Sequence, residues 1–296
     1  MSETLGALRR KMQSAGKLQA VVRTMKALAA SSIGQYERAV QALTDYDRTV
    51  EMGLIAFFRR QGVAGGGAPS ESRQKRAVGV VVFGSDQGLV GKFNEALVDF
   101  TVETLGALAG EKKVWAVGER LHMRLEDAGL PPTGGFVVPN SVTAITPLVA
   151  EILTTLERQR SQGEINHVYL FYNRPQAQTL YDQVSQRLLP LDDTWRRDLS
   201  EGRWPTRNLP QLLVESERTL AALIREYLFV SLFKACAESL ASENASRLAA
   251  MQRAEKNIEE LLEELGGTFH RLRQSGIDEE LFDVISGYES LGFKKR

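Results

Sequence analysis

The chain has 296 residues, 43% of them apolar, which is enough to bury a substantial core. Lysine plus arginine and aspartate plus glutamate both number 37, so the charge balance indicates neither a nucleic-acid-binding protein nor an acidic tail. The single cysteine, Cys236, excludes an internal disulfide and a multi-cysteine zinc site, and we interpret it as a small core residue. No apolar run approaches the roughly 20 residues that span a bilayer, and no apolar secretion segment opens the chain.

Residues 1–60 predict one long helix. Apolar residues recur in steps of three and four, and the pattern continues to Phe57 and Phe58. At ~1.5 Å rise per residue this helix would be roughly 80 Å long, longer than the helices of an ordinary domain. Its apolar positions are Leu5, Leu8, Met12, Ala15, Leu18, Val22, Met25, Ala29, Ile33, Tyr36, Val40 and Leu43.

An alternation of strands and helices follows a glycine-, proline- and serine-rich linker at residues 61–76. The continuous β-branched run of residues 77–83 is typical of a strand covered on both faces. Further strands are predicted at 113–117, 135–138, 167–172 and 183–191, the last at a sheet edge, with helices at 93–108, 119–128 and 142–160. This order predicts a mostly parallel sheet layered by helices, and an irregular return at 192–209.

The turn after the first strand, residues 83–94, lies where an α/β sheet commonly binds phosphate. The phosphate-loop pattern fails, because Asp86 and Phe93 stand where glycine and Ser or Thr are required, and the dinucleotide pattern of three spaced glycines fails as well. We therefore expect no nucleotide here, and we expect Ser85 or Asp86 to cap a turn or a helix start.

A second long helix is predicted from about Leu212 to Leu272. The first 60 residues hold ten basic and five acidic residues, whereas residues 209–296 hold eleven and fifteen, so opposite charges favour the pairing of the two helices. We expect them to bury each other as an antiparallel coiled coil. The apolar positions of the second helix are Leu220, Leu223, Tyr227, Val230, Phe233, Ala237, Leu240, Leu248, Met251, Ile258, Leu262, Leu265, Phe269 and Leu272.

Two groups of polar residues could suggest chemistry but are interpreted as structural. The three histidines, His122, His167 and His270, fall on separate predicted elements, so no metal site is expected. Four glutamates at 259, 260, 263 and 264 have the spacing of a solvated helix face. No nucleophile, base and orienting acid can be assembled from the spacing, so no catalytic residue is proposed.

Taken together, these motifs resemble the gamma subunit of the F-type ATP synthase over nearly the whole chain. The residues that carry the resemblance are Met25 to Ser31, Ser85 to Gly91 with Asn94, Leu188 to Leu191, Glu243, Asn244, Arg247, Ala250, Met251, Ala254, Asn257, Arg273, Gln274, Ile277, Glu280 and Ile285 to Gly287. The chain departs from the family at Gln87, Val90, Asp278 and residues 16–18, and it lacks the regulatory cysteine pair of chloroplast members. These departures suggest a divergent bacterial or alternative ion-pumping branch.

The resemblance implies an α/β fold class: a long antiparallel two-helix coiled coil made by residues 1–60 and 209–296, with a Rossmann-like α/β domain inserted at residues 77–208. It implies a non-catalytic rotor shaft, without cofactor or metal, that couples ion translocation to ATP synthesis or hydrolysis. The expected partners are the alpha and beta subunits of the catalytic head, the epsilon subunit and the c-subunit ring, at the cytoplasmic face of the bacterial inner membrane.

The resemblance also assigns partner contacts to individual residues. Met25, Lys26, Arg273 and Gln274 are expected near the catalytic subunits, and Leu291 and Phe293 are expected to form a bearing tip. Two other classes remain open from the residues alone. One is a nucleotide-dependent α/β enzyme, and the other is a coiled-coil adaptor or scaffold protein with an α/β domain.

Overall fold

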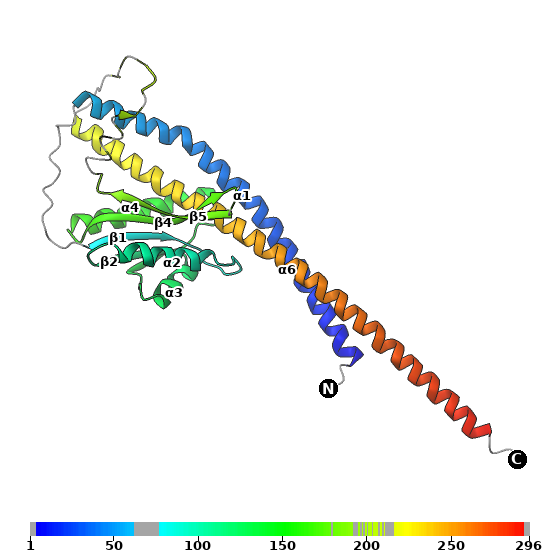
Figure 1. Cartoon of the computed structure of the whole chain (residues 1–296). Helices are drawn as coiled ribbons and strands as arrows, with labels where there is room; N and C mark the ends of the chain where they lie inside the picture. Colours follow the sequence, from blue (N-terminus) through cyan, green and yellow to red (C-terminus); the bar gives the residue numbers. More distant parts are fainter. Residues whose placement is uncertain are drawn as a thin grey trace. The chain divides into compact units, whose positions relative to one another are not determined.

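A computed structural model (Figure 1) describes residues 4–61, 77–178, 180–191 and 216–292, together with residues 195, 197, 199, 201–202, 204–206, 208 and 210. The predicted linker and much of the predicted irregular return lie outside the described residues. The chain divides into two compact units. Unit 1 comprises residues 1–28 and 248–296, and unit 2 comprises residues 29–247.

Two long helices, α1 (Leu5–Gln61) and α6 (Ser216–Gly292), confirm the predicted helical ends of the chain. Each helix contributes to both units. Helix α6 continues beyond Leu272 to Gly292, within the helical segment expected at residues 209–296. No helix among the described residues is both long and apolar enough to cross a lipid bilayer.

Unit 2 contains a five-stranded sheet with the strand order β3-β2-β1-β4-β5. The strands are β1 (Ala77–Phe83), β2 (Lys112–Val117), β3 (Gly134–Phe136), β4 (Ile165–Gln176) and β5 (Leu180–Leu189). Strands β3, β2, β1 and β4 run parallel, and β5 is an antiparallel edge strand. All five predicted strands are present, and the mostly parallel sheet is confirmed.

Helices cover both faces of this sheet. Alternate residues of β1 point to opposite sides, and all seven are buried. On one side Val78, Val80 and Val82 pack with α2 (Phe93–Gly106) and α3 (Glu119–Asp127). On the other side Val81 and Phe83 join a core with α4 (Ile145–Ser161) and the unit 2 part of α6. A strand buried on both faces explains the continuous β-branched run in the sequence.

The predicted helix at 142–160 begins differently from the expectation. A short 3₁₀ turn occupies Val142–Ala144, and the α-helix starts only at Ile145. Pro147 has no N–H to donate to the carbonyl four residues earlier, so it belongs in the first turn of an α-helix and not in its interior. The position of this proline therefore sets the start of α4.

In unit 1, the part of α1 up to Leu28 and the part of α6 that begins at Leu248 bury a narrow seam against each other, which stops before the exposed last turns of α6. Leu8, Ala15 and Met251 are buried, and most other predicted seam positions are half-buried. Two predictions were wrong: Leu5 and Leu18 are exposed. A helix pair buries a narrower stripe than a domain core, so residues at the edge of a 3.6-residue pattern remain outside.

Candidate partner-contact sites

A cluster of charged side chains joins the two helices of unit 1. The Arg23 Nε donates to Glu255 Oε1 over 2.8 Å, and Arg23 Nη2 donates to Glu259 Oε1 over 3.3 Å. Lys26 Nζ forms an ion pair with Glu255 Oε2. The hydrogen bonds from Lys26 and Arg23 lower the pKa of the Glu255 carboxyl. These contacts confirm the expected attraction between a basic first helix and an acidic second one.

Of the predicted contact residues on α1, Lys26 is therefore already engaged by its own chain, and Met25 is half-buried. Met25 nevertheless lies on the same helix face as three exposed apolar residues, since their spacing of three and four places them in one stripe. These residues are Leu18, Val21 and Leu28, with exposed fractions of 58%, 55% and 64%. The 18, 21, 25, 28 spacing is visible in the sequence, but the predicted seam included only Leu18 and Met25 of these four residues, and the spacing does not say which side of the helix is exposed.

The predicted contact residues on α6 are partly exposed and partly beyond what can be described. Arg273 and Gln274 are exposed. Leu291 lies in α6, but its side chain is outside the description, and Phe293 lies outside the described residues altogether. The structure places Lys26 against Glu255, so it does not bring Lys26 together with Arg273 or Gln274.

The last described turns of α6 expose a group of large apolar side chains. Phe282 and Tyr288 are 75% and 81% exposed, and their neighbours on the helix share this exposure. Large exposed apolar surface on a soluble protein marks an interaction site. The other members of this apolar helix end are Ile277, Leu281, Val284 and Ile285.

The turn after β1 uses its polar groups to hold unit 2 together. Asp86 accepts hydrogen bonds from the backbone N–H of Glu119, at the start of α3, over 2.9 Å and from that of Val138 over 3.1 Å. Asn94 and Ser85 exchange two buried hydrogen bonds. The expectation that Ser85 or Asp86 caps a helix start is confirmed for Asp86, which caps α3. The carboxylate thus ties the turn after β1 to the N-terminus of α3, where a negative charge is favourable.

Helix α6 passes over the carboxyl ends of the central strands, the crevice in which open α/β sheets usually bind ligands. Three serine hydroxyls donate hydrogen bonds there. Ser239 donates to the Phe83 carbonyl over 2.9 Å, Ser242 to the Asn173 carbonyl over 3.0 Å, and Ser246 to the Val90 carbonyl. The protein's own helix therefore fills this crevice, which argues physically against a dinucleotide in it.

One carboxylate in this part of α6 is incompletely paired. Glu243 Oε1 accepts from Arg247 Nη2 over 2.5 Å, whereas Glu243 Oε2 is buried and has no hydrogen-bond partner in the described part of the chain. Burial raises the pKa of Glu243 against the opposing effect of Arg247, and the charge of Asp86 raises it further. The sequence placed Glu243 and Arg247 on the shaft, but it did not indicate that Glu243 is buried and Arg247 half-buried.

Cys236 and the four glutamates of α6 agree with the structural interpretation. Cys236 is buried, and this burial raises the pKa of its thiol. Glu259, Glu260, Glu263 and Glu264 are all exposed on α6. Among the described residues, no group of three His, Cys, Asp or Glu side chains could hold a metal ion.

Comparison with known proteins gives one consistent result. A family model described as "ATP synthase" matches residues 4–291. The "ATP synthase gamma chain" of Granulibacter bethesdensis is 27% identical, with 97% of this chain and 99% of the relative covered, and that of Desulforapulum autotrophicum is 24% identical with the same coverage.

Among solved structures, a chain of the Euglena gracilis mitochondrial ATP synthase, in a structure of its OSCP, F1 and c-ring, matches with a TM-score of 0.68. The two are 16% identical, and 99% of this chain and 96% of that chain are covered. A central-stalk and c-ring structure from Tetrahymena thermophila gives a TM-score of 0.57 at 23% identity, with 79% and 99% covered. These structural matches establish a shared fold.

Proposed function

The chain belongs to the ATP synthase family, and from this premise we propose that it is the gamma subunit, the central rotor shaft of a rotary F-type ATP synthase or ATPase. The match to gamma chains extends over nearly the whole of both sequences. The subunit performs no bond chemistry. It couples ion translocation through the membrane sector to ATP synthesis or hydrolysis in the ring of alpha and beta subunits.

The observation that best supports this function is the combination of surfaces on unit 1. A stiff two-helix pair carries a lone helix end whose apolar residues are exposed. Such an end is poorly suited to an isolated protein in water, but it suits a shaft that turns inside a protein sleeve. Small and apolar surface also lets the shaft turn, because it avoids the strong buried ion pairs that would hold it at one angle.

Rotation can act on the catalytic sites because the shaft is asymmetric. Within a ring of three alpha and three beta subunits, α1 and α6 present different side chains in each direction. Each angle of the shaft then stabilises a different open or closed state at each catalytic site, which is a coupling of binding free energies. The partners of the inserted α/β domain are the epsilon subunit and the ring of c subunits.

We further propose that Met25, Lys26, Arg273 and Gln274 contact the catalytic subunits, and that Leu291 and Phe293 form the bearing tip. The exposed stripe around Met25 and the exposure of Arg273 and Gln274 support the first assignment. Lys26 would make its contact while paired to Glu255. We place the subunit peripherally at the cytoplasmic face of the bacterial inner membrane, and the division into 1–60, 61–76, 77–208 and 209–296 stays a prediction.

Reconstitution tests this function. The purified chain is mixed with the alpha and beta subunits of the same organism, and a bead attached to unit 2 is followed under a microscope during ATP hydrolysis. We expect a stable complex in which the bead rotates stepwise in one direction. If the chain forms only homodimers, the proposal is overturned in favour of an adaptor. The same conclusion follows if the alpha and beta subunits have equal ATPase activity with and without this chain.

A further inference from the structure

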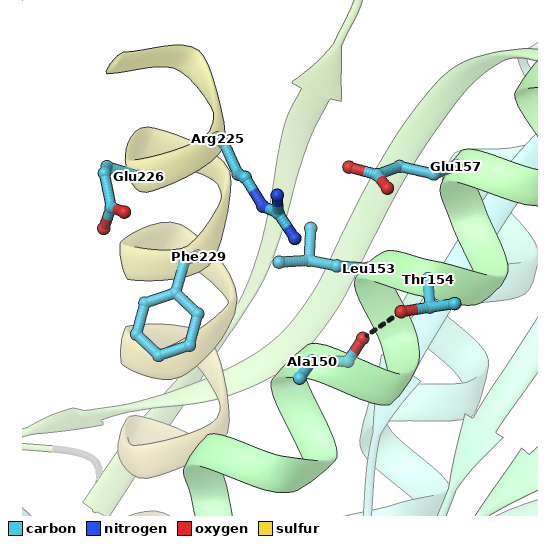
Figure 2. A pocket seen from close by; sticks show the side chains of 7 residues that line it. All are labelled: Ala150, Leu153, Thr154, Glu157, Arg225, Glu226 and Phe229. Atoms are coloured by element: carbon cyan, nitrogen blue, oxygen red, sulfur yellow. Dashed lines mark hydrogen bonds between the residues drawn. The ribbon is translucent and has the colours of Figure 1, made fainter. Parts of the chain in front are cut away.

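A pocket of about 270 Å³ opens on unit 2 between α4 and α6 (Figure 2). It is far larger than the space needed for one ordered water. It falls below the roughly 300–1,000 Å³ of pockets that hold cofactors or drug-sized ligands. Its size therefore suits one or two side chains of a neighbouring protein.

The floor of the pocket is apolar. Leu153 of α4 is buried, and Phe229 of α6 packs against the same core, with its ring centroid 6.2 Å from that of Phe233. The Thr154 hydroxyl donates to the Ala150 carbonyl over 2.8 Å, so its polar group is satisfied within its own helix. A guest on this floor meets hydrocarbon and gains free energy by leaving water.

The rim of the pocket carries charges of both signs. Arg225 of α6 and Glu157 of α4 extend from opposite sides over Leu153 (Figure 2). Within the part of the chain described by the structure, neither side chain forms an ion pair or a side-chain hydrogen bond. Glu226 differs, because its carboxylate accepts a hydrogen bond from Tyr46 Oη over 2.6 Å. Arg225 and Glu157 are thus both free for an external partner.

We propose that this pocket docks another subunit of the assembly through one bulky apolar side chain, flanked in that subunit by an acidic residue for Arg225 and a basic residue for Glu157. The inference rests on the function proposed above. A simple anion would be repelled by Glu157, and a simple cation by Arg225. A lipid chain would leave Arg225 and Glu157 unmatched, whereas a guest with both signs around an apolar centre matches both of them. The third charged lining residue, Glu226, already accepts a hydrogen bond from Tyr46.

Site-specific photo-cross-linking in the whole assembly tests this assignment. A benzophenone amino acid replaces Thr154 at the pocket, and in a control chain it replaces Glu151, which is exposed on the same helix but does not line the pocket. We expect the probe at 154 to attach to one other subunit, at an apolar residue beside an acid and a base. Attachment of both probes in equal yield, or attachment of the 154 probe only to lipid or to a second copy of this chain, would overturn the proposal.

A filled pocket provides a second measurement. Thr154→Trp blocks the entrance, and we expect about a tenfold rise in the dissociation constant for the cross-linked subunit, as for loss of a well-packed anchor, whereas Glu151→Trp leaves it unchanged. Arg225→Glu should also weaken binding, and reversal of the partner's acidic residue should restore it. If the rotating complex forms but the Thr154→Trp chain binds the cross-linked subunit with unchanged affinity, the docking proposal fails and the proposed function stands. If no complex forms with any chain, the proposed function fails.

Discussion

Residues 230–246 and 277–289 belong to the same helix, α6, yet their side chains have opposite surroundings. The first stretch is buried on nearly every side within unit 2, including its serines and Glu243. The second is exposed on every side within unit 1. The difference shows that one continuous helix can supply a core in one place and an interaction surface in another. Stability and partner binding should therefore respond to different mutations.

The largest expected effect comes from the buried stretch. Leu232 is fully buried in the core between the sheet and α6. Leu232→Ala removes this side chain and leaves a cavity, so we expect the free energy of unfolding to fall by about 2–5 kcal/mol. Urea unfolding of the isolated chain, followed by circular dichroism, measures the change. A loss below about 1 kcal/mol would mean that this stretch of α6 is not a true core element.

A second prediction concerns how the free energy of unfolding depends on pH through Glu243 in the buried stretch. Burial raises the pKa of Glu243 above its unfolded value, so the folded state holds the proton more tightly than the unfolded state. The stabilisation from this proton is complete below the unfolded pKa and is lost as pH rises through the folded pKa. Unfolding from about pH 4 to pH 8 should show wild type losing stability relative to Glu243→Gln as pH rises. A difference that stays constant with pH would contradict the assigned burial.

A smaller effect is expected at the seam of unit 1. Glu255→Gln removes the charge that Arg23 and Lys26 share. Because these ion pairs lie near the surface, the loss of stability should be much smaller than for Leu232→Ala and should shrink with added salt. The lowered pKa of Glu255 predicts that its contribution is present above the unfolded pKa and is lost as pH falls through the folded pKa. Thermal unfolding at low and high salt checks this, and a salt-independent change would contradict it.

The smallest effect on stability is expected at the exposed stretch. Phe282→Ala should change the free energy of unfolding by no more than about 0.5 kcal/mol, because this side chain contacts solvent. In the assembled enzyme the same substitution should lower the coupling of ATP hydrolysis to rotation. Unfolding of the isolated chain and ATPase assays of the complex separate the two results. A variant that destabilises the isolated chain would show that the helix end packs against its own chain.

Much of the fold could be predicted because its signals are local. The β-branched run of β1 and the long apolar stripes of α1 and α6 each have a period that specifies one kind of element. The exposure of Leu18 could not be predicted, because it depends on how wide a seam the partner helix covers. The burial of Glu243 was also invisible, since glutamate in a helix normally faces solvent.

The candidate contact residues show the same limit. Charge counts predicted attraction between the two helices, but they could not select Glu255 as the partner of Lys26, which depends on the register of the helices. The pocket between α4 and α6 was invisible for a similar reason. Arg225 and Glu157 lie far apart in the sequence, and only the packing of two helices on one sheet face brings them to the same opening.

The three serines of α6 that donate to carbonyls of unit 2 have a mechanical consequence. If α6 slid along its axis or turned about it, all three hydroxyls would leave their acceptors, and buried carbonyl groups would lose their partners at a cost of about 1–3 kcal/mol each. These three hydrogen bonds thus hold α6 on the sheet against both translation along the helix axis and rotation about it. Torque applied to the α/β domain passes into α6 without slippage.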